Sequence, residues 1–296
     1  MRRGGTYIDA TVGLGGHSYE IAKRLGAAGH LIGLDEDPAA LKIAEAVLGG
    51  RSSVLGKADD AEPKTQDLRP DWPTVTLLHR SFAAVAKGVE PGTIDGLLAD
   101  LGVSSLQLDD AARGFSFQAE GPLDMRMDPH AERTAEQVVN HLDERELADL
   151  IYEFGEERRS RRIARAIVRS RPIQTTAQLA EVISAAARSM KLGQGKHERI
   201  HPATRTFQAL RIFVNRELDD LRALLEAAPR ILKPGGQVVV ISFHSLEDRI
   251  VKDAFRDGAS QGLYRLLTKK PVMATEEESD RNPRARSAKL RAAERV

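Results

Sequence analysis

Short apolar segments alternate with helical segments through the first hundred residues of the chain. Residues 6–10 have the composition of a buried strand, a glycine cluster follows at 13–16, and a helical stretch runs over 17–25. The same alternation continues downstream. Further strands are predicted at 31–34, 75–78 and 94–99, and a further helix is predicted at 38–47. Strands that alternate with helices form a parallel, doubly wound sheet. The sequence therefore predicts an α/β fold.

Glycine and acidic residues stand where these strands end. Ligands of a doubly wound sheet bind beyond the carboxyl ends of its strands, and glycines there let a ligand approach the backbone closely. Asp35 ends the second strand twenty residues after Gly15, the separation at which an acid can hydrogen-bond both ribose hydroxyls of an adenosine. A tight turn followed by an ordinary strand-end carboxylate is the simpler alternative. Because the strand, turn, helix and acid occur together, the sequence favours a nucleoside cofactor.

The glycine loop also distinguishes between cofactors. Residues 9–15 fit D-x-T-x-G-x-G, the acidic-start loop of Rossmann-like methyltransferases, with Thr11 in place of the first glycine. They do not fit G-x-G-x-x-G, because Gly16 is followed by His17 and Ser18. A dinucleotide needs that last glycine so that the helix packs closely under the pyrophosphate, whereas S-adenosylmethionine has no phosphate. The loop favours methyl transfer, and a nicotinamide-dependent oxidoreductase on the same architecture remains the alternative.

Composition narrows the remaining classes of function. The chain has no cysteine, which fits a reducing compartment and excludes disulfides, iron–sulfur clusters and methylation of a pyrimidine carbon through a covalent thiolate. Lys and Arg number 44 against 43 Asp and Glu, so any surface for nucleic acid must be local. No apolar run reaches the length of a membrane span, and strand-like sequence begins close to Met1. We therefore expect a soluble cytoplasmic protein without a signal peptide or membrane contact.

The alternation of strands and helices stops after the fourth strand for about a hundred residues. Helical periodicity instead extends over 134–187. We predict a sheet domain formed by residues 1–106 and 201–296, interrupted by a small inserted helical domain at 107–200.

Four arginines of the inserted domain recur at steps of four, three and four, which stacks them on one face of a helix. They are Arg158, Arg162, Arg165 and Arg169. Ile163 and Ile167 face the opposite side. The stripe is either a phosphate-contacting surface or an ordinary solvated face that Glu156 and Glu157 partly neutralise. The excess of arginine favours contact with RNA.

Two histidines have a spacing that could bind a metal on a helix. His197 and His201 are four residues apart, but Gly193 and Gly195 indicate a loop. No third ligand is evident, so we predict no metal site.

The last hundred residues return to the pattern of helix and strand. Residues 202–231 predict one long amphipathic helix with a core-packing stripe of Phe207, Leu210, Val214, Leu218, Leu221 and Leu225. A strand over 237–241 then ends in a polar cluster, 242–249, which contains His244 and lies on the ligand-binding edge. Such a cluster is more often functional than a bare surface loop. Alternatively, Ser245 caps the next helix with Asp248 at its third position.

Several segments together closely resemble one protein family. They are DATVGLGGHS at 9–18, LGVSSLQLD at 101–109, RGFSF with GPLDMRMD at 113–128, HPATRTFQALRIFVNREL at 201–218 and SFHSLEDR at 242–249. The family is the MraW family of ribosomal RNA small subunit methyltransferases, and the resemblance covers essentially the whole chain. It implies a Rossmann-like class I methyltransferase domain, with a seven-stranded, mostly parallel sheet and an inserted all-helical substrate-recognition domain. Family members usually begin with a further segment containing a His-x-Pro-Val-like stretch, whereas Met1 here stands almost on the first strand.

The resemblance also implies an activity, which is N4-methylation of a cytidine in the decoding region, at the P site, of 16S rRNA in the small ribosomal subunit. The residues implied to bind S-adenosylmethionine are Gly15, Gly16, His17, Asp35, Phe82, Asp100 and Gln107. The Asn-Pro-Pro-Tyr type of motif of DNA amino-methyltransferases is absent, since Asp100 is followed by Leu101, Gly102 and Val103. DNA is therefore not expected as a substrate. The oligomeric state stays open, with a homodimer among the alternatives.

An exocyclic cytosine amine is a poor nucleophile, because its lone pair is delocalised into the ring. Methyl transfer to it needs positioning and an acceptor for the lost proton. The residues expected by position to contact the amine are Asp100 with Ser104 or Ser105, supported by His244 or Asp248. Phe115 or Phe243 is expected to stack on the extruded base. A non-catalytic ribosome-assembly protein is a further alternative.

Overall fold

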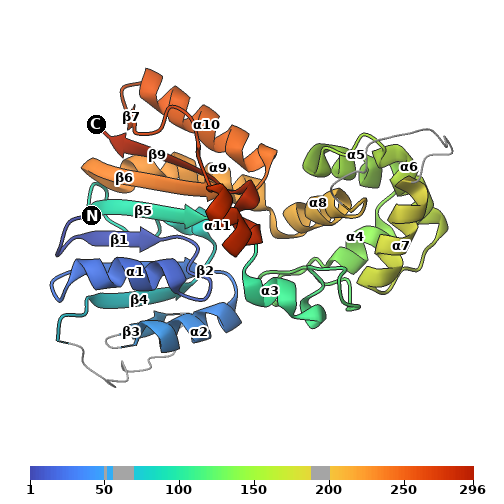
Figure 1. Cartoon of the computed structure of the whole chain (residues 1–296), viewed down its shortest axis with the longest axis horizontal. Coiled ribbons are helices and arrows are strands. Elements are labelled where there is room, and N and C mark those ends of the chain that lie inside the picture. The colour runs from blue at the N-terminus through green and yellow to red at the C-terminus, as the bar shows by residue number, and fades with distance from the viewer. Residues whose placement is uncertain (50–51, 56–69, 188–200) are drawn as a thin grey trace. The chain divides into compact units, whose positions relative to one another are not determined.

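The computed structural model describes residues 1–49, 52–55, 70–187 and 201–296. The chain forms two compact units (Figure 1). The sheet unit comprises residues 1–102 and 218–296, and the helical unit comprises residues 103–217. None of the helices in the described part of the chain has the length and apolar character needed to cross a membrane.

The sheet unit is built on a mostly parallel sheet. Its strands are β1 (Thr6–Asp9), β2 (His30–Asp35), β3 (Ser52–Leu55), β4 (Thr74–His79), β5 (Ile94–Asp100), β6 (Leu232–Ser242), β7 (Tyr264–Leu266), β8 (Val272–Met273) and β9 (Lys289–Arg295). Their order is β3-β4-β2-β1-β5-β6-β9-β7, with β8 paired to β9, and β9 runs antiparallel to its neighbours. The chain changes direction across the sheet between β1 and β5, which makes this the topological switch point.

This architecture confirms the predicted Rossmann-like class I fold. The number of strands differs, because the described residues form a nine-stranded sheet rather than the expected seven. The four-residue β3 extends one edge of the sheet, and the two-residue β8 adds to β9. Strands this short leave too little periodicity in the sequence to be recognised.

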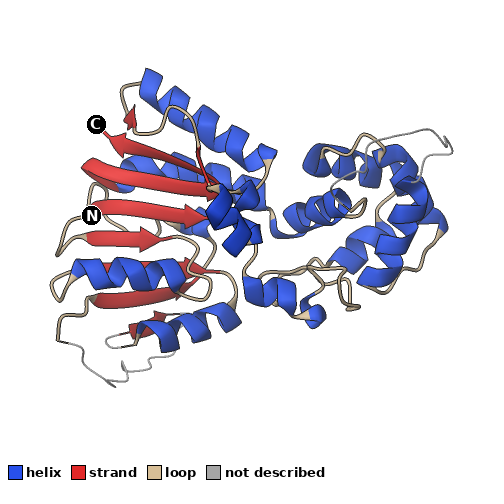
Figure 2. Ribbon diagram, in the orientation of Figure 1, coloured by secondary structure: helices blue, strands red, loops and turns tan. Residues whose placement is uncertain are grey.

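Helices lie on both faces of the sheet (Figure 2). In this unit they are α1 (Gly16–Leu25), α2 (Pro38–Leu48), α9 (Glu217–Ile231), α10 (Ser245–Ser260) and α11 (Glu276–Arg281). Successive side chains of a strand point to opposite faces, and Tyr7 and Ile8 of β1 accordingly belong to different hydrophobic clusters. Tyr7 shares its cluster with Leu25 of α1 and Leu41 of α2, whereas Ile8 shares its cluster with Leu224 of α9. Both faces of the sheet are therefore packed against hydrophobic side chains.

The helical unit has a hydrophobic core of its own. Its helices are α3 (Ser105–Asp109), α4 (Ala135–His141), α5 (Glu144–Gly155), α6 (Ser160–Arg169), α7 (Thr176–Ala187) and α8 (Thr204–Asn215). One cluster unites side chains from these helices, among them Val138, Ile151, Ile163 and Phe207. The helical character of the insertion matches the sequence prediction.

The boundaries of the helical unit differ from the predicted 107–200 because α8 belongs to it. The single helix expected over 202–231 is two helices, α8 and α9, separated at Arg216, whose φ is 53°. Leu210 packs in the core of the helical unit, and Leu221 packs in the core of the sheet unit. Because the apolar period continues across the break, the pattern alone could not show that one stripe serves two cores.

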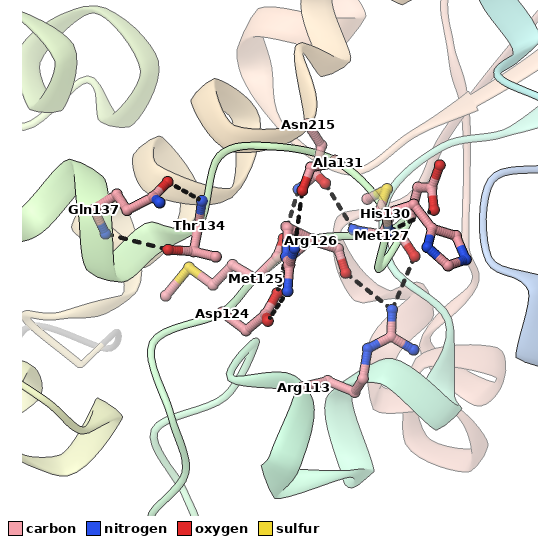
Figure 3. Close-up of polar contacts among 11 residues, drawn as sticks. Arg113, Asp124, Met125, Arg126, Met127, His130, Ala131, Thr134, Gln137 and Asn215 are labelled. Carbon is pink, nitrogen blue, oxygen red and sulfur yellow. Dashed lines mark hydrogen bonds and ion pairs between the residues drawn. The ribbon is translucent and has the colours of Figure 1, made fainter.

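Side chains rather than regular structure hold the loop between α3 and α4 (Figure 3). The amide of Asn215, the last residue of α8, donates to the carbonyl of Met125 at 2.8 Å and accepts from the backbone N–H of Met127 at 2.8 Å. The Arg113 guanidinium donates to the carbonyls of Arg126 and Met127, both at 2.9 Å. Met125 is fully buried with a φ of 61°, a conformation that is unfavourable for a long side chain. These bonds stabilise that conformation and give the loop a defined shape.

Candidate functional site

Three adjacent strands of the sheet unit end in an aspartate. Asp9 ends β1, Asp35 ends β2 and Asp100 ends β5. Because β1 pairs in parallel with both β2 and β5, the three carboxyl ends lie on the same edge of the sheet, at the switch point. The sequence predicted this location for Asp35 and Asp100, but it treated Asp9 only as the first residue of a motif.

Asp9 ties the first strand to the first helix. Its side chain is fully buried, and its two carboxylate oxygens accept hydrogen bonds from the Ser18 hydroxyl at 2.6 Å and from the Thr11 N–H at 3.2 Å. Burial raises the pKa of Asp9, against the effect of these hydrogen bonds. Since both oxygens point into the fold, the geometry gives Asp9 a structural role that shapes the glycine loop.

Asp35 joins the glycine loop to the second helix. One carboxylate oxygen accepts from the Gly13 N–H at 2.7 Å, and the other accepts from the Asp37 N–H at 2.8 Å. Burial raises the pKa of Asp35 to about 6. Each carboxylate oxygen can accept more than one hydrogen bond, so this side chain retains capacity for two hydroxyl donors from a ligand.

Gly15 and Gly16 are neighbours in the loop, but only Gly15 is required by the packing of the chain. Gly15 has a φ of 87°, and a Cβ placed on it would lie 3.2 Å from the Ala44 Cα of α2. The fold itself therefore requires glycine at position 15. Gly16 begins α1 without a left-handed φ, and a Cβ on it would meet nothing within 4 Å. No contact within the described chain explains Gly16, which leaves its backbone open to a ligand.

Asp100 carries an acceptor oxygen that the described chain does not use. Its backbone N–H donates to the Thr11 hydroxyl at 2.7 Å, which accounts for threonine in the first glycine's place. Its Oδ2 lies 3.3 Å from Nε2 of His17. The hydrogen bond that His17 donates to Asp100 raises the pKa of His17, although burial opposes the shift. Oδ1 of Asp100 is buried and has no hydrogen-bond partner among the described residues. A buried oxygen of this kind is costly unless a donor reaches it.

Phe82 follows β4, the strand that pairs with β2. It begins a short 3-10 helix (Phe82–Ala84) and packs, partly buried, against one of the two core clusters of the sheet unit. Ser81 fixes this turn by accepting from the Ala83 N–H at 3.1 Å and donating to the Asp220 carboxylate. Phe82 therefore stands beyond the end of β4, consistent with its predicted place at the cofactor edge.

The polar cluster after β6 is organised by His244 rather than by Ser245. His244 is the N-cap of α10, and its Nδ1 accepts weakly from the Glu247 N–H at 3.4 Å. Glu247 is buried and accepts from the Phe243 N–H at 2.8 Å. Nε2 of His244 lies 3.2 Å from Oε1 of Glu247, although it makes no hydrogen bond. The alternative in which Ser245 and Asp248 form the cap is wrong.

Asp248 instead links α10 to the sheet. Arg291 of β9 donates to it at 2.7 and 3.3 Å, and Lys289 donates at 3.4 Å. Although burial alone raises the pKa of Asp248, these cations lower it on balance. A carboxylate held in its charged form by two cations is a poor proton acceptor, so the ion pair accounts for Asp248 without a catalytic role.

Two predicted site residues, Ser104 and Gln107, belong to the helical unit. Ser104 is the N-cap of α3, where its hydroxyl accepts from the Gln107 N–H at 3.2 Å while Oε1 of Gln107 accepts from the Ser104 N–H at 2.9 Å. Phe115 is 7% exposed within the core of this unit, so the expectation that it stacks on a base is wrong. Phe243, in the sheet unit, is only partly buried and keeps that predicted role.

The arginine stripe is shorter than the sequence predicts. Because α6 begins at Ser160, Arg158 precedes the helix, while Arg162, Arg165 and Arg169 lie on its exposed face. Ile163 and Ile167 are fully buried on the other side, as expected.

The acids and histidines near this stripe have other partners. Glu157 is buried, accepts from the Arg159 N–H at 2.8 Å and pairs with Arg205 at 3.7 Å, so that it does not neutralise the stripe. His201 packs against Phe117 with ring centroids 4.6 Å apart, and His197 lies outside the described residues.

Alanine variants of Gly15 and Gly16 test whether only the first of these glycines is required by the fold. Gly15→Ala should destabilise the sheet unit by about 1 to 2 kcal/mol, because alanine is unfavourable at a left-handed φ. Gly16→Ala should leave stability unchanged or raise it by up to about 1 kcal/mol, because alanine is the better helix former. Differential scanning calorimetry of both variants beside the unmodified protein measures the difference. Equal losses of stability would show that Gly16 is also required by packing.

The family of the chain follows from comparison with known proteins. The sequence profile of the MraW methylase family matches residues 1–296. A protein from Koribacter versatilis (strain Ellin345), named Ribosomal RNA small subunit methyltransferase H, is 68% identical over 295 residues, a match that covers 100% of this chain and 89% of that protein. A protein of the same name from Acidobacterium capsulatum is 61% identical over 295 residues, covering 100% of this chain and 93% of that protein.

Solved structures match more distantly. A SAM-dependent O-methyltransferase from Thermotoga maritima has a TM-score of 0.41 and 10% identity, with coverage of 100% of this chain and 60% of that one. The family assignment therefore rests on the sequence matches, which span the whole chain and confirm the resemblance of its motifs. The chain belongs to the MraW methylase family.

Proposed function

We propose that the chain transfers a methyl group from S-adenosylmethionine to N4 of a cytidine in the decoding region, at the P site, of 16S rRNA in the small ribosomal subunit. Membership of the MraW methylase family supports methyl transfer, and relatives named Ribosomal RNA small subunit methyltransferase H support the class of substrate. The observation that carries the proposal is the edge of the sheet, where an open glycine backbone, the Asp35 carboxylate and the unused oxygen of Asp100 occur together. A ribosomal substrate would also locate the protein in the cytoplasm.

The residues of this edge fit the parts of S-adenosylmethionine. Asp35 would accept hydrogen bonds from the ribose hydroxyls. Each of its oxygens accepts one backbone N–H and has a further lone pair available. Gly16 would let the cofactor approach the backbone, since no side chain of the described chain fills that space. Oδ1 of Asp100 offers a buried anionic acceptor that suits an ammonium group. His17, Phe82 and Gln107 keep the cofactor contacts that the family resemblance implies.

When bound, S-adenosylmethionine supplies a methyl group made electrophilic by the sulfonium. The chain then has to hold the cytosine amine in line and accept hydrogen bonds from it, which restores part of its nucleophilic character. Oδ1 of Asp100 is the strongest candidate for this contact if the cofactor's ammonium does not occupy it. Ser104 and His244 keep the catalytic roles predicted from their positions, and Nε2 of His244 is, like Oδ1 of Asp100, a buried polar atom without a hydrogen bond.

The proposed reaction can be tested with methyl-labelled S-adenosylmethionine and small ribosomal subunits that lack the modification. We expect label in 16S rRNA, and mass mapping should locate it on N4 of one cytidine. Naked 16S rRNA as a parallel substrate shows whether assembly is required. Label on another atom or nucleotide would contradict the substrate assignment. Binding of subunits without any transfer would favour the assembly protein, and tighter binding of NADH than of S-adenosylmethionine would favour the oxidoreductase.

The pKa of Asp35 predicts how cofactor binding depends on pH. Ribose hydroxyls donate to the ionised carboxylate, so affinity should rise with pH through about 6 and level off above it. One pH unit below the pKa the ionised fraction falls about tenfold, so at pH 5 we expect about tenfold weaker binding than at pH 7. Calorimetric titration with S-adenosylmethionine over this range measures the effect. Asp35→Asn should bind weakly and lose this step, and an unchanged step in the variant would assign it to another group, such as His17.

Asp100→Asn separates the two uses of the Asp100 carboxylate. Loss of a hydrogen bond to a charged group costs about 1.5 to 3 kcal/mol, which corresponds to a factor of roughly 10 to 150. If the carboxylate holds the cofactor, the loss appears in the Kd for S-adenosylmethionine; if it holds the amine, the loss appears in kcat at saturating cofactor. Glu20→Gln, which removes one exposed charge on α1, is the matched control. Wild-type values for both constants would remove Asp100 from the mechanism.

A further inference from the structure

The helical unit contains a surface groove between α6 and α7 that the proposed reaction does not use. Its volume is about 500 Å³. Arg162, Arg165 and Arg169 line it from α6, and Glu181 stands on the α7 side. Small apolar side chains, among them Ala166 and Ala185, also line it. The groove therefore combines a row of cations with aliphatic side chains.

The core of the unit fixes the orientation of this row. Ile163 and Ile167 are fully buried, and this turns the arginines of α6 outward. At a rise of 1.5 Å per residue, the three arginines span roughly 10.5 Å of the helix axis. A nucleic-acid strand advances by roughly 3.4 Å per phosphate along its axis, so this length corresponds to about three steps from one phosphate to the next. The spacing matches a run of regularly placed anions better than a single charged group.

The charge balance of the groove also favours an anionic occupant. Three guanidinium groups and one carboxylate, that of Glu181, line the groove. Arg165 makes an exposed ion pair with Glu144 at 3.1 Å, which an incoming phosphate can replace at little cost. No aromatic side chain lines the groove in the described part of the chain, so it lacks the stacking surface that binds bases. Backbone contact is the recognition that this chemistry supports.

We propose that the groove between α6 and α7 binds the phosphodiester backbone of the ribosomal RNA substrate, with Arg162, Arg165 and Arg169 contacting phosphates of one strand and the aliphatic side chains of the lining lying against ribose. This inference rests on the proposed function for the identity of the RNA. It assigns Arg158 no part, because that residue precedes α6 and does not line the groove. Contacts of this kind anchor and orient a strand without reading its sequence.

Two double variants with equal loss of charge test the groove. Arg162→Gln/Arg169→Gln removes two lining cations, and Arg158→Gln/Arg161→Gln removes two exposed cations of the same segment that do not line the groove. The measurement is the Kd for unmodified 16S rRNA and for small subunits across a range of salt concentrations. We expect the groove variant to bind at least tenfold more weakly near physiological salt. Its salt slope should fall by roughly 1.4, at roughly 0.7 for each phosphate of a single strand that the protein no longer neutralises.

The control variant should retain wild-type affinity, and both variants should retain wild-type melting temperatures and cofactor affinity. Equal weakening in the control would overturn the proposal in favour of a general charge effect. Wild-type binding by the groove variant would overturn it directly. Weakened binding to subunits but not to naked 16S rRNA would overturn it in favour of an acidic protein partner. If the groove variant alone loses RNA binding while the wild-type protein transfers no methyl group, the groove stands and the proposed function fails.

Discussion

The hydrogen bonds of the Asp35 carboxylate are the interaction on which the cofactor edge depends. They connect the end of β2 to the loop after β1 through the Gly13 N–H, and they start the turn into α2 through the Asp37 N–H. Removal of a charge from water is costly, and the pKa of about 6 shows that two backbone donors do not fully offset the burial of this one. A ligand with hydroxyl donors would supply the missing stabilisation. Burial of the Asp35 carboxylate therefore explains both its raised pKa and its proposed role in binding.

Around that carboxylate, some residues of the sheet edge are explained by the fold itself and others are not. Asp9 and Gly15 serve the fold, the first through two internal hydrogen bonds and the second through close packing on α2. Gly16 and Oδ1 of Asp100 have no such explanation within the described chain. The positions proposed to bind the cofactor are therefore places where the chain leaves a packing or hydrogen-bonding requirement unmet, as expected of a preformed binding site.

In the helical unit, too, some residues fix the fold while others remain exposed on the surface. Its core and the bonds from Asn215 and Arg113 fix the loop between α3 and α4, and buried isoleucines fix the outward face of α6. Charged groups can then be presented in a defined row without being folded into the core. A rigid presentation of this kind reduces the entropy lost on binding, and it is consistent with a surface that anchors a long, regularly charged polymer.

The sequence by itself determined the parallel sheet, and it predicted both the edge for a ligand and the place of Asp35 on it, because strand and helix periods and the spacing of an acid from a glycine loop are local properties of the chain. It could not locate the break at Arg216, since the apolar period of α8 and α9 is continuous although Leu210 and Leu221 enter different cores. Burial of Phe115, the omission of Arg158 from α6 and the capping role of His244 were likewise decided by tertiary structure. Each depends on which distant segment supplies the neighbouring atoms, and neither composition nor periodicity records that choice.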